Sequence, residues 1–252
     1  MTTRVPTSLR NLVFLLIAAA GLTSAQTAST GALTGTYVFS ERGNATTTLA
    51  SLNLAADGTV SGTAVVQQGF QLATYAVQGT YVTKADNSKS LTLSGPSLDT
   101  LDANGDPLLY NEALMMIPVS SNSFATLRTD QGQNVGQLTA SAQALASGTY
   151  QISGRPVDPA DTSVELVNLN SAGSISGQKI TNSFGQIVQK VLSGNTTVTP
   201  TGFQQITVNA SFTDANGNPQ TATETYLALA TQSDIRMIQT GGGAPGPLTL
   251  SK

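Results

Sequence analysis

The sequence predicts an all-β protein made of two tandem, duplicated antiparallel β units of about 110 residues each. A turn-forming stretch occurs twice, since Leu52–Gly62 is repeated as Val167–Gly177. Short runs of alternating apolar and polar residues follow one another at even spacing and are joined by turns rich in Gly and Asn. After the N-terminal segment, no stretch shows the 3.6-residue apolar period of a helix.

The duplication is marked by landmarks that recur in the same order, with a spacing that drifts only between 110 and 115 residues. We therefore expect one β unit at residues 26–142 and a second at residues 143–252. No long linker separates them, so the two units should touch. The recurring landmarks are Gly35, Tyr37 and Arg42 with Gly148, Tyr150 and Arg155; Gly58 with Gly173; Asp102–Pro107 with Asp214–Pro219; Glu112 with Glu224; and Gly136–Ser141 with Gly246–Ser251.

The alternating runs of the first unit predict eight strands. The alternation is clearest in the second unit, where Ile206, Val208, Ala210 and Phe212 fall on one face. Asn104-Gly105 and Asn216-Gly217 supply the positive φ angles that tight hairpins need. The predicted strands of the first unit lie near residues 34–41, 46–55, 59–68, 72–83, 90–95, 108–118, 123–129 and 135–141.

Eight short strands joined by hairpins favour an up-and-down β-barrel or barrel-like meander, because closure removes the exposed sheet edges. The opening Gly-Thr-Tyr of each unit and the Ala-Asp-Gly hairpin resemble the small β-barrels of the avidin and lipocalin type. The chain has no Trp, so the biotin pocket of avidins is not implied. Ile206–Pro219 resembles a strand and turn of the bacterial immunoglobulin-like repeats found in adhesins, which makes two immunoglobulin-like β-sandwiches the alternative. The same turns also resemble uncharacterised tandem-repeat proteins exported by soil bacteria, a resemblance that implies no activity.

The N-terminus has the features of a secretory signal peptide over residues 1–25. Arg4 and Arg10 form a positive segment, Leu12–Leu22 is apolar, and Thr23–Ala25 offers small residues for cleavage. The apolar run has 11 residues, fewer than the ~20 that a membrane-spanning helix needs. We therefore expect a bacterial protein that is secreted, periplasmic or on the cell surface, with no membrane span after cleavage.

Composition excludes several kinds of chemistry. The chain has no His and no Cys, which removes a Ser-His-Asp triad, a thiol nucleophile and the usual zinc, copper and haem ligands. Beyond residue 25, nine basic residues stand against 14 acidic ones, so nucleic acid is not an expected partner. No nucleotide-binding glycine motif follows a strand. We assign no catalytic residues, no metal ligands and no cofactor.

A pair of carboxylates could still hydrolyse a glycoside, and the chain has four Glu residues: Glu41, Glu112, Glu165 and Glu224. Glu112 and Glu224 hold equivalent places in different units, so they need not be close together. We expect each to face solvent or to pair with Arg42 or Arg155 of its own unit.

Two further sets of residues are candidate binding sites that a purely structural role also explains. Asp102, Asn104 and Asp106, with Asp214, Asn216 and Asn218, have the spacing that begins a calcium loop, but Ala113 and Thr225 replace its last Glu. Turn geometry alone also accounts for these residues, so calcium binding stays open. The recurring Tyr37 and Tyr150 could form an exposed platform for a sugar, but we expect them in the core.

The functional expectation is a non-catalytic exported protein that acts as a binding or surface-interaction module. Its partner could be a carbohydrate, a small apolar molecule or another protein. The alternative is a structural, matrix or adhesin-like protein without a small-molecule ligand, and a carboxylate-dependent hydrolase is the third hypothesis.

Overall fold

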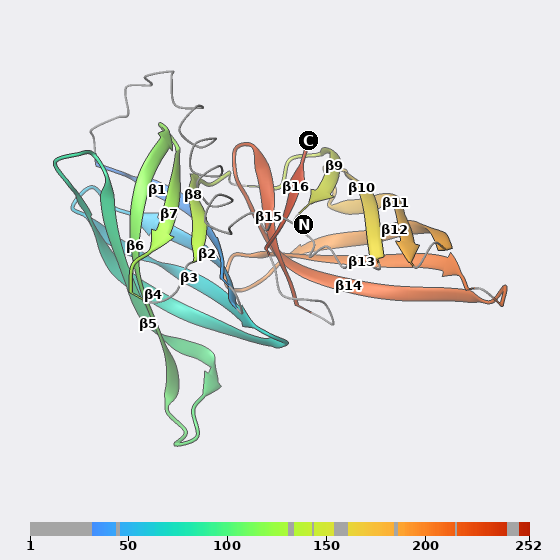
Figure 1. The fold of residues 1–252 in the computed structure, drawn as a ribbon, viewed down its shortest axis with the longest axis horizontal. Coiled ribbons are helices and arrows are strands. Elements are labelled where there is room, and N and C mark those ends of the chain that lie inside the picture. Colours follow the sequence, from blue (N-terminus) through green and yellow to red (C-terminus); the bar gives the residue numbers. More distant parts are fainter. Residues whose placement is uncertain are drawn as a thin grey trace, which may run out of the picture.

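The computed structural model describes residues 32–43, 46–130, 134–142, 144–153, 161–183, 186–214, 216–240 and 247–252. The signal peptide predicted at residues 1–25 and the recurring Arg155 lie outside these ranges. The regular structure of the described residues is β, and it forms two closed barrels that lie side by side (Figure 1). The sandwich alternative is therefore wrong.

Each barrel is an eight-stranded antiparallel meander in which every strand pairs with the next and the last pairs with the first. Barrel 1 contains β1 (Gly35–Arg42), β2 (Thr46–Leu54), β3 (Thr59–Gln68), β4 (Gln71–Thr83), β5 (Lys89–Leu101), β6 (Pro107–Ser120), β7 (Ser123–Arg128) and β8 (Val135–Ala140). Barrel 2 contains β9 (Gly148–Ser153), β10 (Asp161–Leu169), β11 (Ser174–Ser183), β12 (Gln186–Val198), β13 (Gln204–Thr213), β14 (Pro219–Ala230), β15 (Asp234–Gln239) and β16 (Pro247–Ser251).

The predicted strands of the first unit match the observed ones closely, except that β5 and β6 are longer. The pairing of β5 with β6 shifts between Pro96 and Leu101. Beyond this irregularity the two strands continue together as an arm that extends away from barrel 1 (Figure 1). The strand predicted near residues 90–95 ends where Gly95-Pro96 falls in the sequence, and both residue types weaken or end a strand.

Strand pairing defines which residues of the two barrels are equivalent. Tyr37 pairs with Leu52 as Tyr150 pairs with Val167, and Leu93 pairs with Glu112 as Val208 pairs with Glu224. These pairs reproduce the offsets of 112 to 115 residues expected from the sequence.

The last landmark needs a correction. Phe39 pairs with Leu138 and the equivalent Ile152 pairs with Leu250, so the last strands superimpose at an offset of 112 and not 110 residues. A shift of two residues keeps every side chain on the same face of a strand. The apolar pattern therefore could not reveal it, whereas closure of the barrel fixes it.

Side chains that point inward fill both barrels. Tyr37 and Tyr150 are buried in the two cores, as expected, and Ile206, Val208 and Ala210 share the inner face of β13. The cavity lined by the core side chains of barrel 2 measures about 10 Å³, which is no more than about one water molecule occupies. Leu52, Leu91, Leu114 and Leu138 are fully buried inside barrel 1.

Glycines recur where neighbouring strands approach most closely. A Cβ atom at Gly79 would lie 1.8 Å from the carbonyl oxygen of Thr92, and one at the equivalent Gly194 would lie 2.0 Å from that of Thr207. Both contacts are with backbone, which cannot move without disturbing the ladder. These glycines are therefore required by the curvature of the barrels.

We expect Gly79→Ala to lower the free energy of unfolding by roughly 1–3 kcal/mol, because the added methyl group forces β4 and β5 apart. Gln78→Ala is the matched control, since Gln78 is exposed on the outer side of the same strand and should change stability by less than about 0.5 kcal/mol. Urea denaturation followed by circular dichroism measures both. Equal stabilities of the two variants would contradict the assignment.

The two barrels contact each other through apolar outer faces. We call the outer side of the first four strands of a barrel its front face. Its rear face is the outer side of the sixth and seventh strands, together with the residue just before the fifth strand. The front face of barrel 1 packs on the rear face of barrel 2 in one buried cluster. The cluster comprises Val38, Leu49, Val65 and the partly buried Leu72 from barrel 1, and Phe203, Leu229, Ile238 and the partly buried Leu227 from barrel 2.

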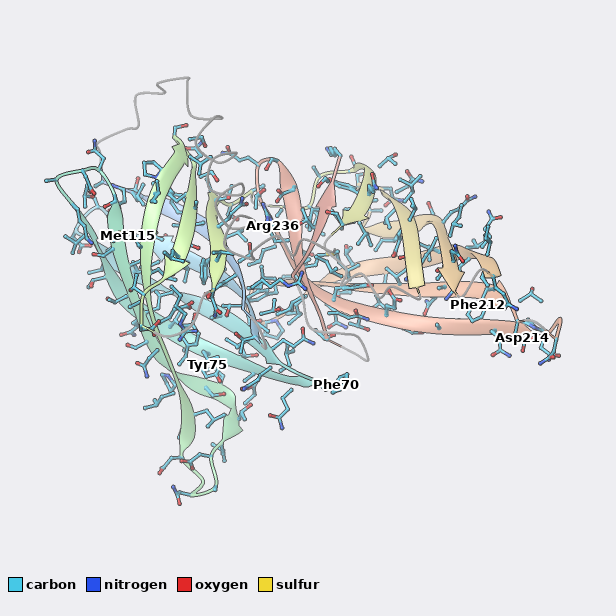
Figure 2. All side chains as sticks on the ribbon, in the orientation of Figure 1. Phe70, Tyr75, Met115, Phe212, Asp214 and Arg236 are labelled. Carbon is cyan, nitrogen blue, oxygen red and sulfur yellow. The ribbon has the colours of Figure 1, made fainter. Side chains whose placement is uncertain are left out.

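Polar contacts surround this apolar contact. Arg236 donates from Nη2 to Gln137 Oε1 at 2.7 Å, and Asn122 donates to Gln232 Oε1 at 3.2 Å. Arg236 lies at the junction of the barrels in Figure 2. The backbone N–H of Ala142, just after β8, donates to the carbonyl oxygen of Ala230 at 2.9 Å. The barrels are therefore joined by packing and hydrogen bonds as well as by the chain.

Candidate functional site

The four glutamates lie inside the barrels, two in each. Glu41, Glu112 and Glu165 are only 2%, 3% and 2% exposed. The expectation that Glu112 faces solvent or pairs with Arg42 is wrong. Glu41 follows Tyr37 and Phe39 on the inner side of β1, whereas Arg42 is the next residue and is exposed.

In barrel 1, Glu41 and Glu112 face each other as two carboxyl groups. Their four oxygens accept no hydrogen bond of normal geometry from another group of the described residues. The two side chains nevertheless interact closely enough to act as hydrogen-bonding partners. We interpret the contact as a pair that holds a proton, because two buried carboxylates without a donor would repel each other.

Burial is the main cause that raises the pKa of Glu112 to about 10, followed by the interaction with the neighbouring carboxyl group of Glu41 and by its charge. The positive charge of Arg128 acts in the opposite direction. Glu112 therefore keeps its proton at neutral pH.

In barrel 2, the positive charge of a lysine compensates the glutamates that lie at the equivalent height of the barrel. Lys179 Nζ lies 3.2 Å from Glu224 Oε1 and 3.5 Å from Glu165 Oε2, and Tyr226 donates its hydroxyl hydrogen to Glu224. The strand pairings make Ala64 the barrel 1 equivalent of Lys179, and Ala50 that of Glu165. The two barrels thus hold charge at the same height, but among the residues described only barrel 2 has a cation in direct contact with its glutamates. In barrel 1 the charge of Arg128 acts on Glu112, but Arg128 pairs with Asp130.

A shallow hollow of about 330 Å³ lies beside β5 and β6, and both Glu112 and Asp130 line it. Asp130 is held by Arg128, whose Nε donates to Asp130 Oδ1 at 2.7 Å. Glu112 is a protonated acid next to this hollow, which is the observation that favours a hydrolase. Its 3% exposure argues against direct contact with a sugar.

The mouth of barrel 1 holds a polar cavity of about 210 Å³. Lys89 lines it together with Asn87, Ser120 and Asn122, and is only 2% exposed. Its Nζ donates to Thr83 Oγ1 at 2.8 Å, and burial lowers the pKa of Lys89. Such a cavity has room for a few waters or a small polar group, and the core residues Leu33, Tyr37 and Phe124 line its apolar side.

The Asp-Ala-Asn-Gly turns at the ends of the two long hairpins hold themselves together. Asp102 Oδ1 accepts hydrogen bonds from the backbone N–H groups of Asn104 and Asp106, at 2.8 and 3.0 Å. Asp214 Oδ1 accepts the equivalent bonds from Asn216 and Asn218, both at 2.9 Å. These bonds account for the Asp as a turn residue. Across the described ranges, no three acidic side chains gather as metal ligands.

The largest features left unaccounted for are two apolar areas on the outside of the barrels. The rear face of barrel 1 carries Met115 and Leu127, which are directly paired, with Ile117 and Val119 on the same strand as Met115. Val135 of β8, which pairs with Leu127, extends this apolar area beyond the rear face. The front face of barrel 2 carries exposed Val164, Leu166, Ile180, Ile187 and Val191, of which Val164 and Ile180 are directly paired. Ile117 is 58% exposed and Ile187 is 75% exposed.

The sequence reasoning missed these faces. A signal was present, because Met115, Met116 and Ile117 are consecutive apolar residues in one strand, and adjacent residues of a strand point to opposite sides. A strand that is apolar on both sides predicts either coverage by another layer or an exposed contact surface.

The arm of β5 and β6 adds a third apolar area. Leu98, Leu101 and Leu109 are all more than half exposed on it. Leu98 lies in the irregular part of β5, which has no counterpart in the regularly paired β13, and the equivalents of Leu101 and Leu109 in barrel 2 are Thr213 and Thr221. The arm leucines are therefore particular to barrel 1 and are not required by the hairpin.

Fold and surface together define a tandem pair of small, filled β-barrels with apolar outer faces. Comparisons with protein families, with curated proteins and with solved structures each gave no match to this chain. Throughout the part of the chain that the structure describes, no helix is long and apolar enough to cross a membrane.

Proposed function

We propose that the protein is a non-catalytic exported module that acts through its outer surface by binding apolar surfaces of other macromolecules. The observation that carries this proposal is the contrast between filled barrel interiors and extended apolar outer faces. A carrier of small apolar molecules needs an internal cavity of some hundreds of cubic ångströms. The cavity among the core side chains of barrel 2 measures only about 10 Å³.

Exposed apolar area supports a contact role. Contiguous exposed apolar patches on a protein commonly mark sites of interaction with other macromolecules. Here the apolar side chains stand on regular strands of closed barrels, so the faces are rigid and exist before any partner arrives. Binding to them would require little ordering of the chain.

A hydrolase is the second candidate, because protonated Glu112 and Asp130 share one hollow. It would require Glu112 to act as a general acid. The hydrolase requires Glu112 and not the apolar outer faces, whereas the binding module requires the outer faces and not Glu112. One set of variants therefore separates the two proposals.

The probe for surface binding is retention on octyl-agarose, an apolar resin. We expect the double variant Ile117→Ser/Leu127→Ser to elute at clearly higher salt than the wild type, because a polar face binds the resin less strongly at a given salt concentration. Glu112→Gln should elute with the wild type, since Glu112 is not on the surface. Hydrolysis of aryl glycosides by the wild type, lost in Glu112→Gln, would overturn the proposal in favour of the hydrolase.

A further inference from the structure

The contact between the two barrels uses different faces of equivalent units. The front face of barrel 1 meets the rear face of barrel 2. Such a head-to-tail contact satisfies one face of each barrel and leaves the other free. The free faces are the rear face of barrel 1 and the front face of barrel 2.

The free rear face repeats the chemistry of the covered one. Strand pairing makes Met115 equivalent to Leu227, Ile117 to Leu229 and Leu127 to Ile238. Leu229 and Ile238 are buried in the contact, whereas Ile117 and Leu127 are exposed. Met115 lies on the side of barrel 1 that faces away from barrel 2 (Figure 2).

The free front face of barrel 2 likewise repeats the apolar residues of the covered front face of barrel 1. Val164 is equivalent to Leu49, Ile180 to Val65 and Ile187 to Leu72. Their barrel 1 equivalents lie in the cluster between the barrels. Strands β10, β11 and β12, which carry this face, lie at the end of the molecule away from barrel 1 (Figure 1).

At one cross-strand pair of the front face, the apolar residue stands on a different strand in each barrel. In barrel 1, Val38 pairs with Ser51 on the front face, and in barrel 2 the equivalent pair is Gln151 with Leu166. The cross-strand pair therefore contributes one apolar side chain in each barrel. The front face of barrel 2 keeps its apolar character at this place.

Other parts of the internal contact are not repeated. Phe203 is completely buried between the barrels, and its barrel 1 equivalent is Ser88. The hydrogen bond from Arg236 to Gln137 is also absent, because their equivalents are Ala125 and Thr249. A contact between two free faces would thus be weaker than the internal one, and it would have to accommodate Lys84, whose Nζ donates to Met115 Sδ at 3.6 Å. It would also lack the tether that raises the effective concentration of the two barrels within one chain.

We propose that the partner of these free faces is a second copy of this chain: the front face of barrel 2 in one molecule packs on the rear face of barrel 1 in the next. This inference rests on the proposed function and names its partner. Because the contact joins unlike faces at opposite ends, its repetition builds a linear row of barrels or, where the rotation closes, a ring. The barrels have no free sheet edges, so the row forms by packing of faces and not by strand addition.

The test uses the exported chain and two double variants, Val164→Asp/Ile180→Asp on the front face and Ile117→Asp/Leu127→Asp on the rear face. Sedimentation velocity is measured over rising concentration. We expect the wild type to form a series of growing species, and each variant alone to associate more than about 30-fold more weakly, as loss of a central contact does. All four positions are about half exposed or more, so the substitutions should leave the fold intact by circular dichroism.

The decisive sample is a mixture of the two variants. Each keeps the face that the other has lost, so a one-to-one mixture should form dimers and no larger species. Val198→Asp is the matched control, because Val198 is 69% exposed and lies outside both faces, and this variant should assemble like the wild type. A variant that still dimerises alone, or a mixture that stays monomeric while the wild type grows, would overturn the head-to-tail contact.

Retention on octyl-agarose, measured on the same samples, separates this inference from the proposed function. A wild type that stays monomeric at every concentration, while the face variants lose retention, overturns the self-assembly and leaves the surface-binding role in place. A monomeric wild type whose face variants are retained as strongly as the wild type itself overturns both.

Discussion

Replacing Glu112 by Gln is expected to make the protein more stable at pH 8 and to remove most of the pH dependence of its stability. The pKa of Glu112 is raised to about 10 in the folded protein, mainly by burial, whereas an unfolded Glu titrates near 4.5. The folded state therefore holds a proton that the unfolded state releases. The stability associated with this proton is fully present below pH 4.5 and is lost as the pH rises toward 10.

The size of this pH dependence follows from the single proton that the folded state binds and the unfolded state releases. The free energy of unfolding of the wild type should fall by up to about 1.4 kcal/mol per pH unit in this window. Gln keeps the shape of the protonated acid and can donate to Glu41, but it has no proton to lose. At pH 8, Glu112→Gln should exceed the wild type by at least about 2 kcal/mol.

The measurement is urea denaturation at several pH values between 4.5 and 9. Far-ultraviolet circular dichroism is a suitable signal because the chain has no Trp. The matched control is Glu224→Gln at the equivalent position of barrel 2, which takes one carboxylate from Lys179 and should cost about 1–2 kcal/mol near neutral pH. Parallel pH profiles for the wild type and Glu112→Gln would show that the carboxyl pair of barrel 1 does not hold the proton.

Replacing Lys179 by Ala should lower the stability near pH 8 by about 3–5 kcal/mol, the range for removing one partner of a buried ion pair. The substitution gives barrel 2 the residue that barrel 1 has at the same place, Ala64. Glu165 and Glu224 would lose the cation that lies within 3.5 Å of both. Burial and mutual repulsion would then favour their protonated forms.

The loss in Lys179→Ala should therefore shrink as the pH falls toward 4, because protonation removes the uncompensated charge. Lys190→Ala is the control: Lys190 Nζ lies 4.5 Å from the ring centre of Phe212 and is only half-buried, so about 0.5–1 kcal/mol with no pH dependence is expected. Denaturation curves at pH 4.5 and 8 measure the loss of stability of each variant at the two pH values. A loss of equal size at both pH values would mean that Lys179 acts through packing and not through its charge.

The two variants together explain how this fold tolerates charge inside a small barrel. In barrel 1 a proton on Glu112 reduces the charge of the two carboxyl groups by one, and in barrel 2 a lysine does the same while a tyrosine hydroxyl donates to Glu224. Both arrangements avoid an isolated buried charge, which would be far more costly than either.

The sequence by itself determined the elements and their inner faces. Alternation with a period of two is a local property, so Ile206, Val208 and Ala210 could be assigned to one buried face before the structure was known. The turns were equally local, because Gly105 and Gly217 adopt the positive φ angles that their Asn-Gly sequences predict. The duplication then gave the number of units, and eight hairpin-connected strands gave the barrel.

Tertiary structure alone decided which residues meet across the barrel and which outer face is covered. Glu41 and Glu112 stand on β1 and β6, strands that do not pair, and only the tilt and closure of the sheet bring their carboxyl groups together. Closure likewise moved the last strand by two residues from its expected register. Leu49 and its equivalent Val164 share the same strand pattern, yet one is buried and the other is exposed. Their difference arises because a contact between faces depends on the placement of whole barrels, which no local pattern encodes.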